Sequence, residues 1–462
     1  MSTIPRTRRA YVETYGCQMN IADGELMEGI LAAAGYRIVA TPEEADVVLV
    51  NTCAVREHAE QRVLGRLGQL GALKRRRPDL LLGVTGCMAQ RMGESLLERA
   101  SHVGLVLGPD AYRSLPKALE RLGVPAREKP AATAPRRRSR PLAVLDLDPV
   151  ENYQGLEQRR KDGASAWVPI QRGCDHRCTF CIVPYVRGPE KNRSAAHVLA
   201  EVRDLAEAGV SDVTLLGQTV NSYAWEGWTF PRLLRAVARV DGIRRVWFTS
   251  PHPNDVTPEM VEVMASEPAV CETLHLPAQS GSDRTLKRML RRYTAEGFLR
   301  KVEMVRAAVP GIALSTDLIV AFPGETEEDF QATLDLVREV RFDDAFTYKY
   351  SPRAGTPATR LPAGEFIAPE VAQARLEALI EVTRRVQAAV NEAEVGRVAD
   401  VLVEKEARKE GQVLGRTRRN KVVAFAGSAE LVGRYRTVVL ERTSGATFVG
   451  SEVPEPALAE LP

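Results

Sequence analysis

The sequence has no apolar run that approaches the roughly 18 residues needed to cross a membrane as a helix. Its first residues, MSTIPRTRRAYVETYG, lack both the apolar core and the small-residue cleavage site of a secretory signal. With 44% hydrophobic and 27% charged residues among 462, the composition is typical of a soluble globular protein. We therefore expect a cytoplasmic protein without membrane association, built from about three domains.

Cysteine is scarce, and its count of seven is odd. An odd number in a long cytosolic chain argues against a disulfide framework and favours metal binding or catalysis. Cys174, Cys178 and Cys181 lie together in RGCDHRCTFC, with the spacing C-x3-C-x2-C. Cys271 stands alone in the apolar stretch PAVCETLHL, where we expect a buried small hydrophobic residue.

The net charge of +3 is too small to identify a partner. The basic residues are nevertheless clustered, at 74–77, 136–140, 158–161 and 416–421. Each cluster alone is typical of solvated surface. Together they favour an anionic polymer such as nucleic acid as a partner.

Residues 8–125 alternate strand-like apolar runs with helical patterns, which predicts a parallel α/β domain. Three strand candidates, AYVETYG, ADVVLVNTC and DLLLGVTGC, end at or just before Cys17, Cys53 and Cys87. Because ligands bind beyond the carboxyl ends of parallel strands, we expect these thiols to converge on one point. Gly16 and Gly86 would let the backbone approach a bulky inorganic group closely.

The remainder of the chain divides into a linker and two further domains. Residues 126–159, rich in Pro, Ala and Arg, are expected to form the linker. Residues 160–392 contain six β/α units, which predict a barrel-like or open-barrel parallel sheet with its active site at the strand carboxyl ends. The motif RGCDHRCTFC follows the first of these strands, where such a site belongs.

Residues 393–456 change to short alternating strands, which predicts a small antiparallel β-barrel. Its basic residues favour RNA binding, and the alternative is a structural cap with a charged surface. The candidates for RNA binding are Arg416, Arg418, Arg419 and Lys421.

Three thiolates on one short loop leave a metal ion or cluster with one open corner. Structural zinc requires four protein ligands, whereas an iron–sulfur cubane on three cysteines keeps one iron free. S-adenosylmethionine (SAM) can bind such an iron and become a source of radicals. An RNA-binding protein with structural metal and no catalysis is the alternative of a different class, and it requires closed coordination.

Several motifs carry a family resemblance from about residue 10 to residue 450. The chain resembles the radical-SAM methylthiotransferases, and among them those that act on N6-isopentenyladenosine in tRNA. One departure is Ala321, where the family usually has Gly. The motifs are TYGCQMN, NTCAVRE, TGCMAQR, RGCDHRCTFCIVPYVRGPEKNRS, LLGQTVNSY, HLPAQSGSDRTL, TDLIVAFPGET, YSPRAGTPA and GRTRRNKVVAF.

The resemblance implies two 4Fe–4S clusters, one on Cys174, Cys178 and Cys181 and a second on the three N-terminal cysteines. It implies a central radical-SAM (β/α)6 partial barrel and a C-terminal barrel similar to the TRAM domain, an RNA-binding module. The implied reaction uses two SAM molecules to methylthiolate C2 of N6-isopentenyladenosine adjacent to the anticodon. Threonylcarbamoyl-adenosine of tRNA and a ribosomal-protein aspartate are alternative substrates for the same chemistry.

The same resemblance suggests partners and supporting residues. The partners are the anticodon loop of tRNA and an electron donor such as flavodoxin or ferredoxin, and we expect a monomer. Some polar residues in the matched motifs are candidates for binding SAM or for ordering the closed site, although each of them also suits a turn, cap or strand end. These candidates are Glu190, Arg193, Gln218, Asn221 and Asp317.

Overall fold

The computed structural model describes residues 6–54, 57–127, 140–160 and 163–453. The middle of the predicted linker, 128–139, and the last residues of the predicted C-terminal domain, 454–456, lie outside the described residues. The chain divides into two compact units. Unit 1 comprises residues 1–161, 169–176 and 182–197, and unit 2 comprises residues 162–168, 177–181 and 198–462. None of the described helices is long and apolar enough to span a membrane.

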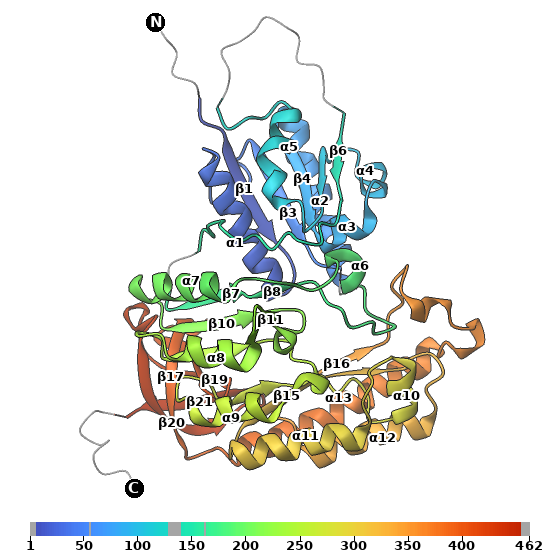
Figure 1. Cartoon of the computed structure of the whole chain (residues 1–462), viewed down its shortest axis with the longest axis vertical. Coiled ribbons are helices and arrows are strands. Elements are labelled where there is room, and N and C mark those ends of the chain that lie inside the picture. Colours follow the sequence, from blue (N-terminus) through green and yellow to red (C-terminus); the bar gives the residue numbers. More distant parts are fainter. Residues whose placement is uncertain (1–5, 55–56, 128–139, 161–162, 454–462) are drawn as a thin grey trace, which may run out of the picture. The chain divides into compact units, whose positions relative to one another are not determined.

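Unit 1 is built on a six-stranded parallel sheet in the order β2-β1-β3-β4-β5-β6 (Figure 1). Every residue of β3 and β4 is buried, which agrees with their continuous apolar sequences and with a sheet covered on both faces. The strands are β1 Arg9–Thr14, β2 Arg37–Ile38, β3 Val47–Thr52, β4 Leu81–Gly86, β5 Leu105–Leu107 and β6 Leu142–Val144. Strand β6 belongs to the segment that the sequence analysis assigned to a linker.

Helices cover both faces of this sheet and form two apolar cores. On one face Leu26 of α1 and Leu119 of α5 pack against Leu49, and on the other Val63 of α2 and Leu96 of α4 line the core. Each buried side chain of this kind contributes about 2 kcal/mol to folding. The helices are α1 Gln18–Ala33, α2 Glu57–Arg76, α3 Cys87–Met92, α4 Ser95–Arg99, η1 Tyr112–Ser114, α5 Leu115–Arg121 and α6 Val183–Arg187, and a small antiparallel pair joins β8 Gln171–Arg172 to β9 Lys191–Asn192.

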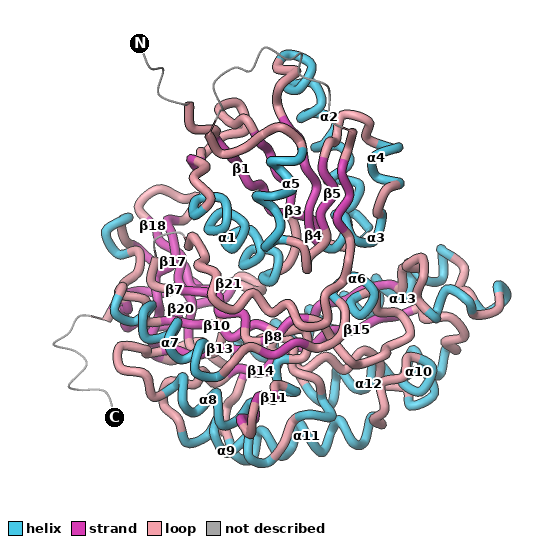
Figure 2. Tube along the Cα trace, turned by 45° about the horizontal axis from the view of Figure 1, so that its top comes forward, coloured by secondary structure: helices cyan, strands magenta, loops and turns pink. Residues whose placement is uncertain are grey.

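Unit 2 contains the predicted (β/α)6 partial barrel. Its strands form two three-stranded sheets, β13-β10-β7 and β14-β15-β16, which a parallel bridge between Val246 and Val270 joins into one arc. Figure 2 shows helices along the outside of these strands. The strands are β7 Ser165–Pro169, β10 Asp212–Leu216, β13 Arg245–Phe248, β14 Thr273–His275, β15 Ala313–Val320 and β16 Asp344–Lys349.

The connecting helices alternate with the strands, and neighbours along the chain pack side by side, α8 on α9 and α11 on α12. Helix α12 begins at a capping box in which Thr326 and Asp329 satisfy each other's backbone N–H groups. The helices are α7 Ala195–Glu207, α8 Phe230–Ala238, α9 Pro258–Ser266, α10 Asp283–Arg288, α11 Ala295–Ala308, α12 Glu327–Val340 and α13 Pro369–Glu392. Shorter elements are η2 Val220–Ser222, β11 Ala224–Trp225, β12 Trp228–Thr229, η3 Pro253–Asp255, η4 Pro357–Arg360 and η5 Ala363–Glu365.

The C-terminal segment of unit 2 forms a closed five-stranded barrel in the order β17-β18-β19-β21-β20. The predicted small barrel is confirmed, but one of its pairings differs from the prediction, because β21 turns back antiparallel to β20 and so runs parallel to β19. Alternating residues such as Val413, Phe425 and Phe448 fill its interior. Its elements are β17 Val398–Glu406, β18 Gln412–Thr417, β19 Val422–Ala426, η6 Ala429–Leu431, β20 Tyr435–Thr443 and β21 Thr447–Glu452.

Candidate functional site

Three cysteines of unit 1 lie at one edge of its sheet. Strands β1, β3 and β4 are neighbours, and their register pairs Thr14 with Asn51 and Thr52 with Gly86, so that their carboxyl ends are level. Cys17 is the N-cap of α1, Cys53 directly follows β3, and Cys87 is the first residue of α3 after β4. The predicted placement of all three thiols at strand ends is therefore observed.

The thiols of Cys17 and Cys53 are hydrogen-bonded to each other. Gly16 and Gly86 make this closeness possible, since they have φ angles of 146° and 91°. A Cβ atom on Gly16 would lie 2.8 Å from the Cβ of Cys53, and one on Gly86 would lie 2.5 Å from the Thr52 carbonyl oxygen. Cys53 and Cys87 are each 5% exposed, whereas Cys17 is exposed, so the group of thiols is open on the Cys17 side.

Buried amides hold the loops that carry these thiols. The Asn51 amide donates to the Asn20 carbonyl at 2.7 Å, and the Asn20 amide donates to the Thr52 carbonyl at 3.2 Å. Both asparagines are fully buried. The Thr52 hydroxyl donates to the Thr85 carbonyl at 2.6 Å. These bonds tie α1 to the end of β3 and β3 to the end of β4, which fixes the spacing of the three cysteines.

Two of the thiols differ in their protonation. The hydrogen bond with Cys53, aided by the positive charge of Arg187, lowers the pKa of Cys17 to about 6, although desolvation of its sulfur atom by the surrounding residues opposes the shift. Burial raises the pKa of Cys87, and the Arg187 guanidinium only partly offsets this effect. Thiolate is the form of cysteine that binds metals. The lowered pKa of Cys17 therefore favours the form that binds metals.

A buried charge network lies beside the Cys87 thiol. The Arg187 guanidinium donates to the Cys87 sulfur at 3.2 Å and to the Asp23 carboxylate at 2.7 Å. Arg172 donates to the other oxygen of Asp23 at 2.5 Å, and its guanidinium stacks 4.7 Å above the Tyr153 ring. Burial alone would raise the pKa of Asp23, but the two guanidinium groups outweigh it and the pKa is lowered. Asp23 is therefore an ionised carboxylate in the interior.

Helix α6 completes the surroundings of Cys87. Its residues Ile182 and Val186 pack with Ala54 and Cys87 in a small apolar cluster. In sequence, Arg172 precedes the C-x3-C-x2-C motif and Arg187 follows it, and both bind Asp23. Both flanks of the motif are thus anchored in unit 1.

The cysteines of the C-x3-C-x2-C motif belong to both units: Cys174 to unit 1, Cys178 and Cys181 to unit 2. The Cys174 amide donates to the Gly188 carbonyl at 3.2 Å. In unit 2 the Cys181 amide donates to the Cys178 carbonyl at 3.1 Å, which closes a tight turn. The guanidinium of Arg291, itself 5% exposed, donates to the Cys178 sulfur at 3.4 Å.

Two of the predicted supporting residues lie in unit 1 and bind protein groups. Arg193 donates to the Pro169 carbonyl at 2.7 Å, and its amide donates to the Ile170 carbonyl. The Glu190 carboxylate accepts from the Asn192 amide at 3.0 Å. These contacts fix the segment that follows the cysteine motif.

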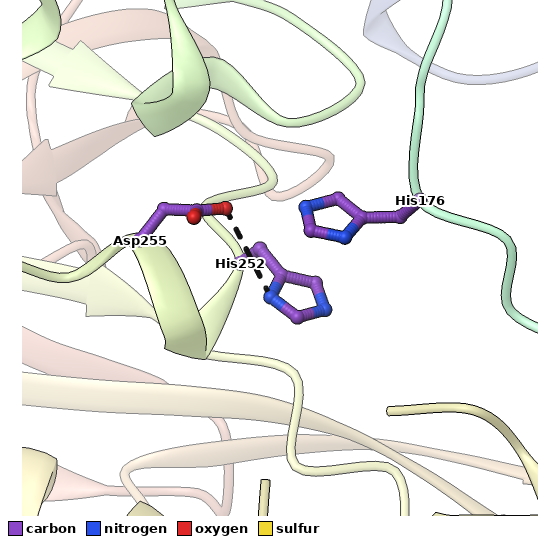
Figure 3. Close-up of side chains that lie close together, drawn as sticks. All are labelled: His176, His252 and Asp255. Atoms are coloured by element: carbon purple, nitrogen blue, oxygen red, sulfur yellow. Dashed lines mark ion pairs between the residues drawn. The ribbon is translucent and has the colours of Figure 1, made fainter. Parts of the chain in front are cut away.

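The other three predicted residues, Gln218, Asn221 and Asp317, lie in unit 2. Asn221 exchanges two hydrogen bonds with the backbone of His252, at 2.7 and 3.0 Å, which is the structural alternative considered for it. Figure 3 shows the Asp255 carboxylate facing the ring of His252, at 4.0 Å from Nδ1. Asp317 on β15 lies 3.4 Å from Nε2 of His275 on β14.

Two buried amide oxygens in unit 2 lack a partner among the described residues. They are Oε1 of Gln218, just beyond β10, and Oε1 of Gln279, just beyond β14. Gln279 is 7% exposed and has a φ of 66°, a backbone angle that residues other than glycine rarely adopt. A buried polar atom without a partner is costly unless a ligand satisfies it. The ligand-binding role of Gln218 stays a prediction, and Gln279, whose amide oxygen is in the same situation, is a residue that sequence reasoning missed.

All four predicted RNA-binding residues form ion pairs inside unit 2. Arg418 pairs with Glu272 at 2.8 Å, and Arg419 pairs with Glu394 at 2.9 Å. Lys421 is 7% exposed, and its ammonium lies 2.8 Å from Asp343. These ion pairs anchor the barrel within the unit, and the role of the four residues in RNA binding stays a prediction. Arg416, which is paired with Glu404, is half-buried, as are Arg418 and Arg419.

Cys271 is 2% exposed, and burial raises the pKa of its thiol, which confirms the prediction of a buried small residue.

Sequence reasoning missed Asp23, Arg172, Arg187 and Arg291. Their signals were weak: the arginines occur in ordinary basic stretches, and nothing in a local pattern marks Asp23 of IADGE as buried.

Three segments match known families in the order in which they occur along the chain. Residues 9–108 match the uncharacterized protein family UPF0004, residues 168–337 match the radical SAM superfamily, and residues 392–447 match the TRAM domain.

Whole-chain relatives are similar over almost the full length. The tRNA-2-methylthio-N(6)-dimethylallyladenosine synthase of Carboxydothermus hydrogenoformans is 43% identical over 446 residues, covering 95% of this chain and 97% of the relative. The protein of the same name from Cereibacter sphaeroides is 45% identical over 427 residues, covering 92% and 94%. Among solved structures, the radical S-adenosylmethionine methyltransferase TsrM from Kitasatospora setae has a TM-score of 0.55 at 19% identity, covering 76% of this chain and 77% of that one. This last likeness concerns the fold.

Proposed function

We propose that this chain, which belongs to the tRNA-2-methylthio-N(6)-dimethylallyladenosine synthase family, transfers a methylthio group to C2 of N6-isopentenyladenosine beside the anticodon of tRNA. The observation that carries the proposal is the group formed by Cys17, Cys53 and Cys87 at the carboxyl edge of the unit 1 sheet. We propose that these thiols bind a cofactor of their own, in addition to the one bound by the cysteine motif in the segment that matches the radical SAM superfamily.

The donor sets suit iron–sulfur clusters better than structural zinc. Each set has three cysteines, whereas a structural zinc site takes four protein ligands. The remaining cysteine, Cys271, is buried and its thiol is held protonated. We propose that Cys17, Cys53 and Cys87 hold one 4Fe–4S cluster, and that the C-x3-C-x2-C motif holds the other. When bound, these clusters supply one-electron cleavage of SAM and the sulfur that is transferred.

The residues of the chain position and enclose these groups. Asp23 and Arg187 fix the Cys87 sulfur, and Arg291 does the same for the Cys178 sulfur. The unpartnered amide oxygen of Gln218 is suited to accept a hydrogen bond from SAM or the substrate, and Asp317 offers a carboxylate on β15. Arg193 and Glu190 contribute by ordering the segment after the motif.

We propose tRNA as the substrate-bearing partner. A base beside the anticodon lies in a single-stranded loop, where it can be unstacked and its C2 exposed to the enzyme. The C-terminal barrel would contribute phosphate contacts through Arg416, Arg418 and Arg419, which are half-buried and retain partial access to solvent. We further propose an electron donor such as flavodoxin or ferredoxin, a cytoplasmic location and a monomeric chain.

The test is mass spectrometry of tRNA nucleosides from cells that lack this protein. We expect isopentenyladenosine to accumulate without its methylthio derivative, and the derivative to return with the wild-type gene but not with Cys17→Ala or Cys174→Ala. Normal levels of the derivative in the deleted strain would refute the proposal.

Two alternatives make different predictions. If threonylcarbamoyl-adenosine or a ribosomal-protein aspartate is the substrate, purified enzyme will modify that compound and leave isopentenylated tRNA unchanged. If the chain only binds RNA through a structural metal, purified protein will contain zinc and will not cleave SAM. Assays of the three substrates beside metal analysis separate these outcomes.

A further inference from the structure

Unit 2 carries an exposed basic surface around Thr179, the residue between Cys178 and Phe180. The surface, which we call the Thr179 patch, consists of the exposed side chains of Arg177, Lys287, Leu290, Arg292 and Arg360. These residues come from three segments far apart in the sequence: the cysteine motif, helix α10 with the turn after it, and η4.

Hydrogen bonds to Thr179 hold the three segments together. The Thr179 amide donates to the Met289 carbonyl at 3.1 Å, and its hydroxyl donates to the Arg288 carbonyl at 2.9 Å. The Thr179 carbonyl accepts from the Ala358 amide at 2.9 Å. The cationic residues therefore belong to segments that are bonded to the same short stretch of backbone, which links two of the cysteines.

The basic side chains of the patch have no acidic partner in the part of the chain that the structure describes. Among the described residues, Arg177, Lys287, Arg292 and Arg360 form no ion pair or hydrogen bond through their side chains. Neighbouring basic residues differ, since Arg288 pairs with Glu365 and Arg284 pairs with Asp329. The exposed acid on the same segment is Asp283, whose carboxylate accepts from the Ala295 amide.

The apolar residue of the patch is held outward by an unusual backbone. Leu290 is 47% exposed, and Leu290 and Arg292 have φ angles of 57° and 53°. This left-handed conformation costs about 1–2 kcal/mol for a residue other than glycine. Met289 and Arg291, which alternate with them, are buried. Met289 packs in an apolar cluster with Phe322 and Ala358, against which Phe180 lies, and Arg291 donates to the Cys178 sulfur. The packing of these inward side chains keeps the outward ones exposed.

We propose that the Thr179 patch is the docking surface for an acidic protein that carries one electron at a time. This inference rests on the proposed function, because radical cleavage of SAM requires an external electron. A carrier docked here gives up one electron, and the cofactor bound by the adjacent cysteines gains it. Basic side chains around one exposed aliphatic residue suit a small, weak and electrostatically steered redox complex. Single-stranded RNA binding relies instead on exposed aromatic platforms, which the patch lacks among its described residues.

The test uses reconstituted holoenzyme and purified flavodoxin as the acidic carrier. Binding is measured by calorimetry, and reduction of the holoenzyme is followed by loss of visible absorbance after mixing with reduced flavodoxin or with dithionite. We expect the Lys287→Glu/Arg292→Glu double variant to bind flavodoxin about tenfold more weakly and to lose much of the salt dependence of binding. Reduction by flavodoxin should slow to a similar extent, while reduction by dithionite and tRNA affinity stay unchanged.

The matched control is Arg408→Glu/Lys409→Glu, which reverses two exposed charges in the turn between β17 and β18. It should leave flavodoxin binding and reduction unchanged. Unaltered flavodoxin binding by the patch variant overturns the inference, and loss of tRNA affinity with normal flavodoxin binding assigns the patch to RNA instead. If dithionite finds no reducible iron in the wild-type protein, the proposed function fails, and the inference fails with it.

Discussion

The guanidinium Nε of Arg187 lies 3.2 Å from the sulfur of Cys87, and the same side chain is held by Asp23. All three residues are buried. An N–H donor and a positive charge beside a ligating sulfur both raise the reduction potential of an iron–sulfur cluster. Arg187 is therefore expected to act as a positioning and tuning residue for the site formed by Cys17, Cys53 and Cys87.

The first prediction concerns Arg187→Gln in a background with Cys174, Cys178 and Cys181 changed to Ala, so that only the unit 1 cysteines can hold iron. We expect a lower reduction potential, because the positive charge beside the sulfur is lost, and faster loss of iron to a chelator. The measurements are a redox titration followed by electron paramagnetic resonance and the rate of iron release.

The control for this prediction is Arg113→Gln, which breaks a half-exposed pair with Glu151 in the same unit. It should change neither the potential nor the rate of iron release. A potential in Arg187→Gln equal to that of the parent would contradict the assigned role, even if the variant were less stable.

The second prediction concerns the anchor of the C-terminal barrel. Arg245 on β13 is 1% exposed, pairs with Asp400 at 2.9 Å, donates to the Arg416 carbonyl at 2.7 Å and lies 4.9 Å from the Tyr435 ring centroid. Arg245→Met should lower the free energy of unfolding by about 2–3 kcal/mol, because buried acceptors lose their donor. Hydrogen exchange should quicken first in β17 and β20.

The matched control removes an exposed arginine of the same unit, Arg300, which pairs with Glu296 on the surface of α11. Arg300→Met should change the unfolding free energy by less than about 0.5 kcal/mol. Equal stabilities of the Arg245 and Arg300 variants would argue against an anchoring role for Arg245.

The third prediction is a pH dependence at Asp212. Burial raises the pKa of its carboxyl group to about 6, although the Trp247 N–H at 2.9 Å and the charge of Arg245 oppose the shift. The folded protein thus binds the proton more tightly than the unfolded chain, whose pKa is about 3.9. The contribution of this group to stability is present below about pH 4 and is lost as the pH rises through about 6.

Asp212→Asn removes this charge and keeps an oxygen that accepts from Trp247. We expect it to raise the free energy of unfolding at pH 7.5 by on the order of 1–2 kcal/mol and to have a much smaller effect at pH 4.5. Chemical unfolding at the two pH values measures the difference. An equal increase in the free energy of unfolding at both pH values would show that the ionisation of Asp212 does not cause the stabilisation.

The fourth prediction concerns Ala321, which is buried and has a φ of 58°. Glycine adopts this conformation without strain, so Ala321→Gly should raise the free energy of unfolding by about 0.5–1 kcal/mol. Ala236→Gly, in the interior of α8, is the control and should lower it by about 1 kcal/mol. Thermal unfolding of both variants measures these changes in stability. A loss of stability in Ala321→Gly would contradict the claim that the backbone of Ala321 is strained.

Sequence reasoning recovered the strands that carry the cysteines, because apolar runs with period-two or continuous burial are local signals. The level ends of β1, β3 and β4 then followed from the general rule for parallel sheets. Short elements were harder: β6 has only three residues, and its alignment against β5 depends on a partner far away in the sequence.

The charged residues were the least predictable. Lys421 and Arg418 occur in a basic stretch that predicts exposed surface. In the structure, Lys421 pairs with Asp343 and Arg418 pairs with Glu272, and both acids are remote in sequence. Asp23 is likewise tolerated in the interior only because Arg172 and Arg187 arrive from more than a hundred residues later. Pairings of this kind are tertiary, and no local pattern encodes them.

The central claim is that each set of three cysteines holds its own 4Fe–4S cluster. Iron and acid-labile sulfide analysis of protein reconstituted without oxygen tests it most directly. We expect about eight irons per chain, falling to about four in Cys17→Ala/Cys53→Ala/Cys87→Ala and to about four in Cys174→Ala/Cys178→Ala/Cys181→Ala. Zinc in place of iron, or about four irons in the wild-type chain with no loss on removal of the unit 1 cysteines, would contradict it.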